Sequence, residues 1–253
     1  MPVLAVIPAR LGATRLTRKP LRLLGGAPLI NRVWERVQSL GVADAVVVAA
    51  DSPEIADAVA QAGGHCLLTS PAHPSGTDRA AEVAQRPEFM GFDIVLNVQG
   101  DEPFITEAAV RGALGMVHDR GFELGTVAAP ASETICHSPD IVKVVCADDG
   151  RALYFSRAPI PWLREPTDAV VRQGLIRQHI GVYAYTRDAL LRWVALPTHP
   201  LERVERLEQL RPLAAGMRIG VAVVDTPPPG GIDTEDDLER ANALWVDLYA
   251  GRT

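Results

Sequence analysis

Cysteine is scarce in this sequence, and its three cysteines, Cys66, Cys136 and Cys146, stand far apart. An odd number of cysteines cannot form a closed set of disulfides, and none of the spacings is that of a paired metal-ligand motif. The sequence therefore argues against a disulfide-stabilised secreted scaffold and against a cysteine zinc site. It predicts small core thiols in a reducing compartment.

Long hydrophobic runs are also missing. The apolar start, residues 1–8, is too short for the hydrophobic region of a secretion signal, and no uncharged run reaches the roughly 20 residues that cross a bilayer. We therefore expect a cytoplasmic protein with no membrane insertion.

A surplus of positive charge is absent as well. The 25 Lys and Arg residues are outnumbered by 31 Asp and Glu, which gives a net charge of −6 and a pI near 5.5. This balance argues against a nucleic-acid-binding surface, so any anion site has to be a local cluster. The 47% of hydrophobic residues in a chain of 253 is enough for a substantial core.

Short apolar runs alternate with amphipathic stretches in the first hundred residues. The predicted strands are residues 3–7, 45–50, 65–68 and 94–98. The predicted helices are residues 29–40, 54–62 and 80–85. This alternation is typical of a parallel sheet with helices on both faces, a Rossmann-like layer.

The pattern changes beyond residue 124. The predicted strands there are residues 124–129, 142–147, 152–157, 181–185 and 219–224, and the predicted helices are 201–214 and 234–248. Asp148, Asp149 and Gly150 predict a hairpin turn between two of these strands. We therefore expect an α/β fold whose sheet is mixed but mostly parallel.

Two adjacent carboxylates follow the apolar run that ends at Leu96, in the motif Asn97-Val-Gln-Gly-Asp-Glu-Pro103. Ligands of open α/β sheets bind outside the carboxyl ends of the strands, which places Gln99, Asp101 and Glu102 at a crevice edge. A hard cation such as Mg²⁺ prefers carboxylate and phosphate oxygens. A plain surface turn is built from the same residue types, so the motif alone leaves both readings open.

A basic loop follows the first predicted strand and carries Arg10, Arg15, Arg18 and Lys19. Guanidinium groups bind phosphate oxygens in a bidentate manner and an ammonium adds a compact charge, so the loop suits a triphosphate. It contains neither a Walker loop nor a Gly-x-Gly-x-x-Gly fingerprint. The alternative is a solvated basic loop.

Two helix starts offer further candidates. His73-Pro-Ser-Gly-Thr-Asp-Arg79 precedes a predicted helix. Its Ser, Gly and Thr residues could cap the helix and leave backbone amides for a ligand, or could serve as the cap alone. Asp233 precedes the last predicted helix and is either its N-cap, in competition with Thr234, or a second metal carboxylate.

Taken together, the motifs resemble those of the 3-deoxy-manno-octulosonate cytidylyltransferase family. In chain order they are Pro8-Ala-Arg10, Lys19-Pro-Leu21, Ser75-Gly-Thr-Asp-Arg79, Asn97-Val-Gln-Gly-Asp-Glu-Pro103, Tyr154-Phe-Ser-Arg157, His179-x-Gly-x-Tyr183, Pro200-Leu-Glu202, Leu207-Glu-Gln-Leu-Arg211 and Gly231-Ile-Asp-Thr234. The resemblance implies transfer of CMP from CTP to the acidic sugar 3-deoxy-manno-octulosonate (Kdo), with release of pyrophosphate, for lipopolysaccharide synthesis. It also implies Mg²⁺, a nucleotidyltransferase fold forming a single domain, 1–253, and a homodimer whose dimerisation subdomain lies roughly within residues 130–215.

The resemblance further implies a set of site residues. Lys19, Asp101 and Asp233 would form the catalytic set, with the two carboxylates holding the metal. The nucleotide would be bound by Ala9, Arg10, Arg15, Lys19, Ser75, Gly76, Thr77, Asp78 and Arg79. The sugar would be bound by Gln99, Arg157, His179, Tyr183, Glu208 and Gln209, with Arg157 on its carboxylate.

Alternatives remain open at this point. His179 and Tyr183 could be satisfied core groups, Arg157 could serve an ion pair, and Glu208 could lie on a solvated helix face. Thr17-Arg18 replaces the family's Pro-Gly, and Gln178 replaces a basic residue, which leaves the loop path and the phosphate affinity undecided.

Two other functions compete. A CMP-sialate synthetase would use a similar fold for a nine-carbon sugar, and a catalytically silent nucleotide-sugar sensor would bind without turnover. The sequence does not choose between Kdo and a modified Kdo such as the 8-amino sugar, because one hydrogen-bond exchange in a pocket changes specificity strongly.

Overall fold

The computed structural model describes residues 1–12 and 15–249, and these fall into two compact units. The first unit combines residues 1–105 with the segment that begins at Pro229, and the second spans residues 106–228. The predicted subdomain, residues 130–215, lies inside the second unit.

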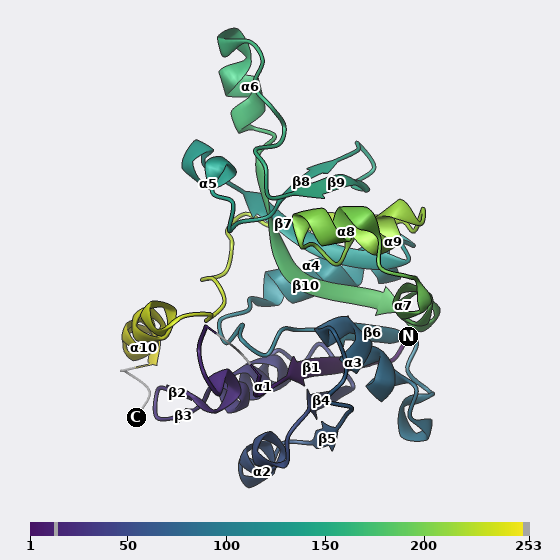
Figure 1. The fold of residues 1–253 in the computed structure, drawn as a ribbon, viewed down its shortest axis with the longest axis vertical. Coiled ribbons are helices and arrows are strands. Elements are labelled where there is room, and N and C mark those ends of the chain that lie inside the picture. The colour runs from purple at the N-terminus through teal and green to yellow at the C-terminus, as the bar shows by residue number, and fades with distance from the viewer. Residues whose placement is uncertain (13–14, 250–253) are drawn as a thin grey trace. The chain divides into compact units, whose positions relative to one another are not determined.

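The first unit is built on a parallel sheet (Figure 1). β1 (Val3–Ala9) lies between β4 (Ala45–Ala50) and β6 (Ile94–Asn97), and β5 (Cys66–Leu68) pairs with the far edge of β4. Consecutive residues of β1, from Leu4 to Ile7, are buried, so both faces of the sheet are covered. The predicted parallel layer is confirmed in this unit.

In the described part of the first unit, four α-helices and a small hairpin accompany the sheet. They are α1 (Leu29–Ser39), α2 (Pro53–Gln61), α3 (Gly76–Ala84), α10 (Glu235–Tyr249) and the hairpin of β2 (Leu23–Leu24) and β3 (Ala27–Pro28), with 3₁₀ turns at η1 (Lys19–Leu21) and η2 (Pro87–Phe89). The predicted start of α3 at residue 80 is wrong by one turn. The helix begins at Gly76 because the Ser75 side chain accepts a hydrogen bond from Asp78 N.

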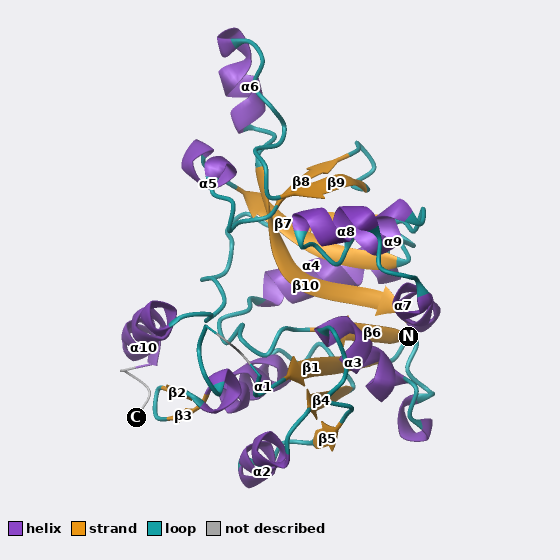
Figure 2. Ribbon diagram, viewed as in Figure 1, coloured by secondary structure: helices purple, strands orange, loops and turns teal. Residues whose placement is uncertain are grey.

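The second unit contains both kinds of strand pairing, as Figure 2 shows. β7 (Leu124–Pro130) pairs antiparallel with β10 (Arg177–Thr186) and parallel with β11 (Ile219–Val223). β8 (Lys143–Cys146) and β9 (Ala152–Ser156) form the predicted hairpin, with Gly150 at φ +82° in the turn. The predicted mixed sheet is confirmed.

The helices of the second unit are α4 (Glu107–His118), α5 (Glu133–His137), α6 (Ala169–Gln173), α7 (Arg187–Ala195), α8 (Pro200–Glu205) and α9 (Leu210–Ala214), and η3 (Pro166–Asp168) precedes α6. α4, α5, α6 and α7 were not predicted. The single helix predicted over 201–214 is wrong, because the chain turns at Arg206 with a left-handed φ of 55° and separates α8 from α9. No helix within the described ranges is both long and apolar enough to cross a membrane.

Candidate active site

A pocket of about 410 Å³ opens in the first unit where β1 and β6 end. Among its lining residues are ten of those expected from the sequence: Ala9, Arg10, Arg15, Lys19, Ser75, Gly76, Arg79, Gln99, Asp101 and Asp233. Residues from four distant parts of the chain therefore meet at the carboxyl ends of parallel strands, the usual place for a ligand in such a sheet.

The turn that carries Asp101 lies directly on the end of β1. A Cβ atom added to Gly100 would come within 2.6 Å of the backbone oxygen of Pro8, so only glycine fits this approach. The close contact holds Gln99 and Asp101 at the pocket, and Ile232 N donates to Asp101 O over 3.0 Å from the segment that carries Asp233.

Asp101 and Asp233 converge on one ammonium group. Lys19 Nζ lies 2.5 Å from Asp101 Oδ2 and 2.9 Å from Asp233 Oδ1. The ammonium group of Lys19 is the cation between them. Two carboxylates that are 132 positions apart in the sequence therefore contact a single positive charge. Burial opposes the charged form of Lys19, but both carboxylates favour it, and the net effect raises its pKa.

These two carboxylates fit a hard divalent cation. Such an ion is commonly held by one or two carboxylates, with phosphate oxygens of the substrate completing its shell. No group of three or more His, Cys, Asp and Glu side chains arranged for a metal occurs in the part of the chain that is described.

The helix cap at Asp233 is provided by its neighbour. Thr234 Oγ1 accepts a hydrogen bond from Asp237 N at 3.2 Å, and Asp237 Oδ2 accepts hydrogen bonds from the backbone N–H groups of Asp233 and Thr234. The Asp233 carboxylate is thereby left to contact Lys19 and, at 2.9 Å, Arg15. Of the two capping candidates, Thr234 is therefore the residue whose side chain caps the helix, and the metal role of Asp233 stays a prediction.

The basic loop is only partly directed at the pocket. Arg10, Arg15 and Lys19 line it, whereas Arg18 forms an ion pair with Glu54 at the start of α2. Arg18 adopts φ 55° and ψ 34°, the left-handed conformation that a glycine adopts without strain, at a cost of roughly 1–2 kcal/mol. The departure from the family pattern thus leaves Arg18 in a glycine-like conformation and places its side chain outside the pocket lining.

The segment before α3 supplies a different subset than expected. Ser75, Gly76 and Arg79 line the pocket, but Thr77 and Asp78 do not. Thr77 is buried in the first helical turn, and Asp78 accepts a hydrogen bond from Ser75 Oγ at 2.6 Å. His73 and Pro74 also line the pocket; the sequence analysis included them in the motif but assigned them no binding role.

Glu102 is a further carboxylate beside the metal candidates. One of its oxygens, Oε2, is buried with no hydrogen-bond partner among the described residues. Burial, together with the negative charges of Asp101 and Asp233, raises the pKa of Glu102 to about 8. In the absence of ligands the side chain therefore carries a proton at neutral pH.

The Glu102→Gln variant is expected to flatten the dependence of stability on pH. Because the folded pKa of about 8 exceeds the ordinary value of 4.5, the stabilisation is full below about pH 4.5 and is lost as the pH rises through 8. Glutamine resembles the protonated acid and does not titrate. Urea unfolding in metal-free buffer between pH 5 and 8.5 measures the effect, and parallel curves for both proteins would contradict the assignment.

Two sugar-binding candidates lie together in the second unit. The rings of His179 and Tyr183 are 5.5 Å apart on β10, at a register shift that follows Ile180. His179 Nε2 lies 2.9 Å from Thr126 Oγ1, and burial lowers the pKa of His179 to about 3. The imidazole is therefore neutral at physiological pH.

The other candidates of this unit surround the break between α8 and α9. Arg157 donates from Nε to Glu205 O and from Nη1 to Pro139 O, each over 3.0 Å. Gln209 is buried at the start of α9, and Glu208 is close enough to Tyr183 to contribute to its raised pKa, for which burial is the main cause. Arg157 thus contacts backbone carbonyls, and within the described ranges its guanidinium forms no ion pair of the kind considered as the alternative.

Comparison with known proteins agrees with this arrangement. The cytidylyltransferase family matches residues 4–219. A 3-deoxy-manno-octulosonate cytidylyltransferase of Gemmatimonas aurantiaca is 60% identical over 100% of this chain and 98% of that protein, and one of Rhodospirillum centenum is 50% identical over 95% and 92%. A solved structure of CMP:2-keto-3-deoxy-manno-octonic acid synthetase complexed with CTP is 38% identical, with a TM-score of 0.90 over 98% of this chain and 100% of that one.

The chain belongs to the cytidylyltransferase family. The resemblance to 3-deoxy-manno-octulosonate cytidylyltransferases drawn from the motifs is confirmed by the full-length similarity. A structure of 4-diphosphocytidyl-2C-methyl-D-erythritol synthase from Anaerococcus prevotii, 13% identical with a TM-score of 0.63 over 96% of this chain and 97% of that one, shares the fold alone.

Proposed function

We propose that this protein transfers CMP from CTP to Kdo, releasing pyrophosphate and forming the activated sugar for lipopolysaccharide synthesis. The observation that carries the proposal is the pocket in which Arg10, Arg15 and Lys19 gather around a pair of carboxylates that share one cation. Cations there neutralise a triphosphate and its leaving pyrophosphate, and the carboxylates suit a metal bound to the same phosphates.

In this proposal Asp101 and Asp233 hold Mg²⁺. Held there, Mg²⁺ would supply charge neutralisation at the α-phosphate and would lower the pKa of the attacking sugar hydroxyl, so no dedicated protein base is assigned. Lys19, Arg10 and Arg15 bind the triphosphate, while Ala9, Ser75, Gly76 and Arg79, which line the pocket, bind cytidine. Rate enhancement comes from positioning and from charge stabilisation.

Sugar binding by the second unit is assigned to His179, Tyr183, Glu208 and Gln209, with Arg157 on the sugar carboxylate. A neutral His179 is suited to hydrogen bonding with hydroxyl groups. Nε and Nη1 of Arg157 already donate to backbone carbonyls, so Nη2 is the group proposed to meet the carboxylate.

A homodimer is part of the same proposal. Figure 1 shows α6 extending from the sheet of the second unit. Large apolar side chains are exposed in α6 and in the segment before it, with Val170 at 86% and Trp162 at 72% of their full exposure. Apolar clusters of this kind mark interaction surfaces. A cytoplasmic location agrees with the free thiols of Cys66, Cys136 and Cys146.

The decisive experiment is a measurement of pyrophosphate release by the purified protein with CTP and Mg²⁺. Kdo, its 8-amino analogue, sialic acid and no sugar are compared. Metal-dependent release with Kdo is expected. Release with sialic acid alone would assign a CMP-sialate synthetase, and CTP binding without release with every sugar would favour a nucleotide-sugar sensor.

A further inference from the structure

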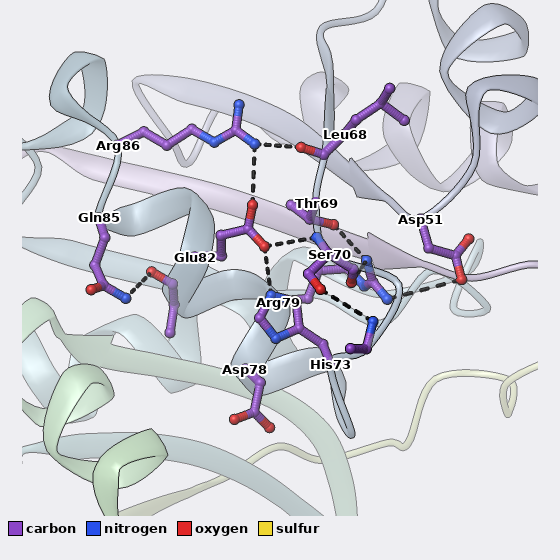
Figure 3. A network of polar contacts seen from close by, with 12 residues as sticks. Asp51, Leu68, Thr69, Ser70, His73, Asp78, Arg79, Glu82, Gln85 and Arg86 are labelled. Atoms are coloured by element: carbon purple, nitrogen blue, oxygen red, sulfur yellow. Dashed lines mark hydrogen bonds and ion pairs between the residues drawn. The ribbon is translucent and has the colours of Figure 1, made fainter.

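The segment between β5 and α3, residues 69–75, forms one wall of the pocket and is called the nucleotide loop here. It supplies His73, Pro74 and Ser75 to the lining. The loop has no helix or strand of its own, so its position depends on side chains that reach it from neighbouring elements. Figure 3 shows these contacts.

The Glu82 carboxylate of α3 contacts the loop at two of its residues. Glu82 Oε2 accepts a hydrogen bond from Ser70 N at 2.8 Å and lies 2.6 Å from His73 Nε2. Its other oxygen, Oε1, accepts from Arg86 Nη2 at 3.2 Å. Glu82 therefore contacts the loop at its beginning and at the residue that enters the pocket lining (Figure 3).

Arg79 contacts the same loop as a hydrogen-bond donor, whereas Glu82 contacts it as an acceptor. The side chain is only 3% exposed, and its Nη1 donates to Ser70 O over 3.1 Å and to Thr69 Oγ1. Arg86 Nη2 also donates to Leu68 O, immediately before the loop. The peptide groups of Ser70 are thus fixed on both sides, by Glu82 at the N–H and by Arg79 at the carbonyl.

The charge state of Glu82 decides what His73 can do. Burial opposes the ionised form, but hydrogen bonds from Ser70, His73 and Arg86 outweigh it, so the pKa of Glu82 is lowered. An ionised carboxylate only accepts hydrogen bonds. His73 Nε2 must therefore carry the hydrogen in this pair, which fixes the orientation and the tautomer of the ring at the pocket wall.

We propose that Glu82 is a positioning residue for the nucleotide: it holds His73 and the nucleotide loop in the shape that binds CTP, without touching the substrate itself. The inference rests on the proposed function, in which this pocket binds CTP. It extends that function to two residues, Glu82 and His73, that lie outside the predicted site.

The test compares Glu82→Gln and His73→Gln with Glu88→Gln as the matched control. Glu88 is exposed on η2 of the same unit and receives the same chemical change as Glu82. CTP affinity is measured by calorimetry without sugar, and kcat and KM are measured for both substrates. Loss of one charge-assisted hydrogen bond is expected to weaken CTP binding about tenfold in both Glu82→Gln and His73→Gln.

The expected pattern separates positioning from general damage. KM for CTP rises while kcat and KM for Kdo stay within about threefold. The double variant binds CTP no more weakly than Glu82→Gln, because both single changes remove the contact between Glu82 and His73. If Glu82→Gln lowers the melting temperature, His73→Gln still decides, since it leaves the Ser70 and Arg86 contacts of Glu82 in place. Wild-type CTP affinity in His73→Gln would overturn the inference, whereas a wild-type protein that binds no CTP would overturn the proposed function instead.

Discussion

Replacement of Asp101 by asparagine is expected to reduce pyrophosphate release by on the order of 100-fold or more. The substitution removes one of the two carboxylates that meet at Lys19 and that fit a divalent cation. Losing a single preorganised charge contact at a reacting centre commonly costs about 100- to 1000-fold in turnover. The measurement is the rate of pyrophosphate release with CTP, Kdo and saturating Mg²⁺.

Asp57→Asn is the matched control for this variant. Asp57 is exposed on α2 in the same unit, outside the pocket lining, so its amide variant should retain wild-type turnover. Both variants should unfold at the wild-type temperature to within a few degrees, because neither removes apolar contacts. Turnover of Asp101→Asn close to that of Asp57→Asn would remove Asp101 from the catalytic set.

Gly125→Ala is expected to cause the largest loss of stability. Gly125 lies in β7, and a Cβ atom there would come within 2.1 Å of the backbone oxygen of Ala113 on α4 and within 3.0 Å of Met116 Cβ. A helix carbonyl cannot turn aside as a flexible side chain can, so α4 and β7 have to separate. We expect a loss of about 3 kcal/mol and a fall in melting temperature of roughly 6–12 °C.

Gly181→Ala provides the comparison within the same sheet. Gly181 lies in β10, which pairs with β7, and a Cβ atom added there meets nothing within 4 Å. This variant should be neutral or slightly more stable, because alanine narrows the unfolded ensemble. Differential scanning calorimetry measures the melting temperatures of both alanine variants. Equal values would show that the packing of α4 on β7 tolerates the added methyl group.

Much of the parallel layer was predictable because its strands are continuous apolar runs ended by turn residues. The same rules missed α4, whose sequence contains Gly112 and Gly115 and so reads as a poor helix. A Cβ on Gly112 would approach Ala222 Cβ at 3.1 Å, which shows that close packing against β11 overrides helix propensity there. The cap at Thr106, whose side chain accepts a hydrogen bond from Ala109 N, was the available signal for this helix.

The site shows a similar division between local and tertiary information. Asp101 and Lys19 could be proposed from local patterns. Asp101 comes shortly after one predicted strand, and Lys19 lies in the basic loop that follows another. The competition between Asp233 and Thr234 for the helix cap could not be decided from sequence, because it depends on which side chain Lys19 and Arg15 reach. His73 was assigned no binding role because its partner, Glu82, lies nine positions along the chain on another element.

The first unit is not continuous along the chain, and this has a consequence for how the protein is made. Its residues 1–105 leave the ribosome well before the segment beyond Pro229 that carries Asp233. At about 5–20 residues per second, the second unit takes on the order of ten seconds to synthesise in between. During that interval Lys19 has Asp101 as a partner but not Asp233, so a nascent chain has only half of the carboxylate pair and gains the complete set when its last helix is translated.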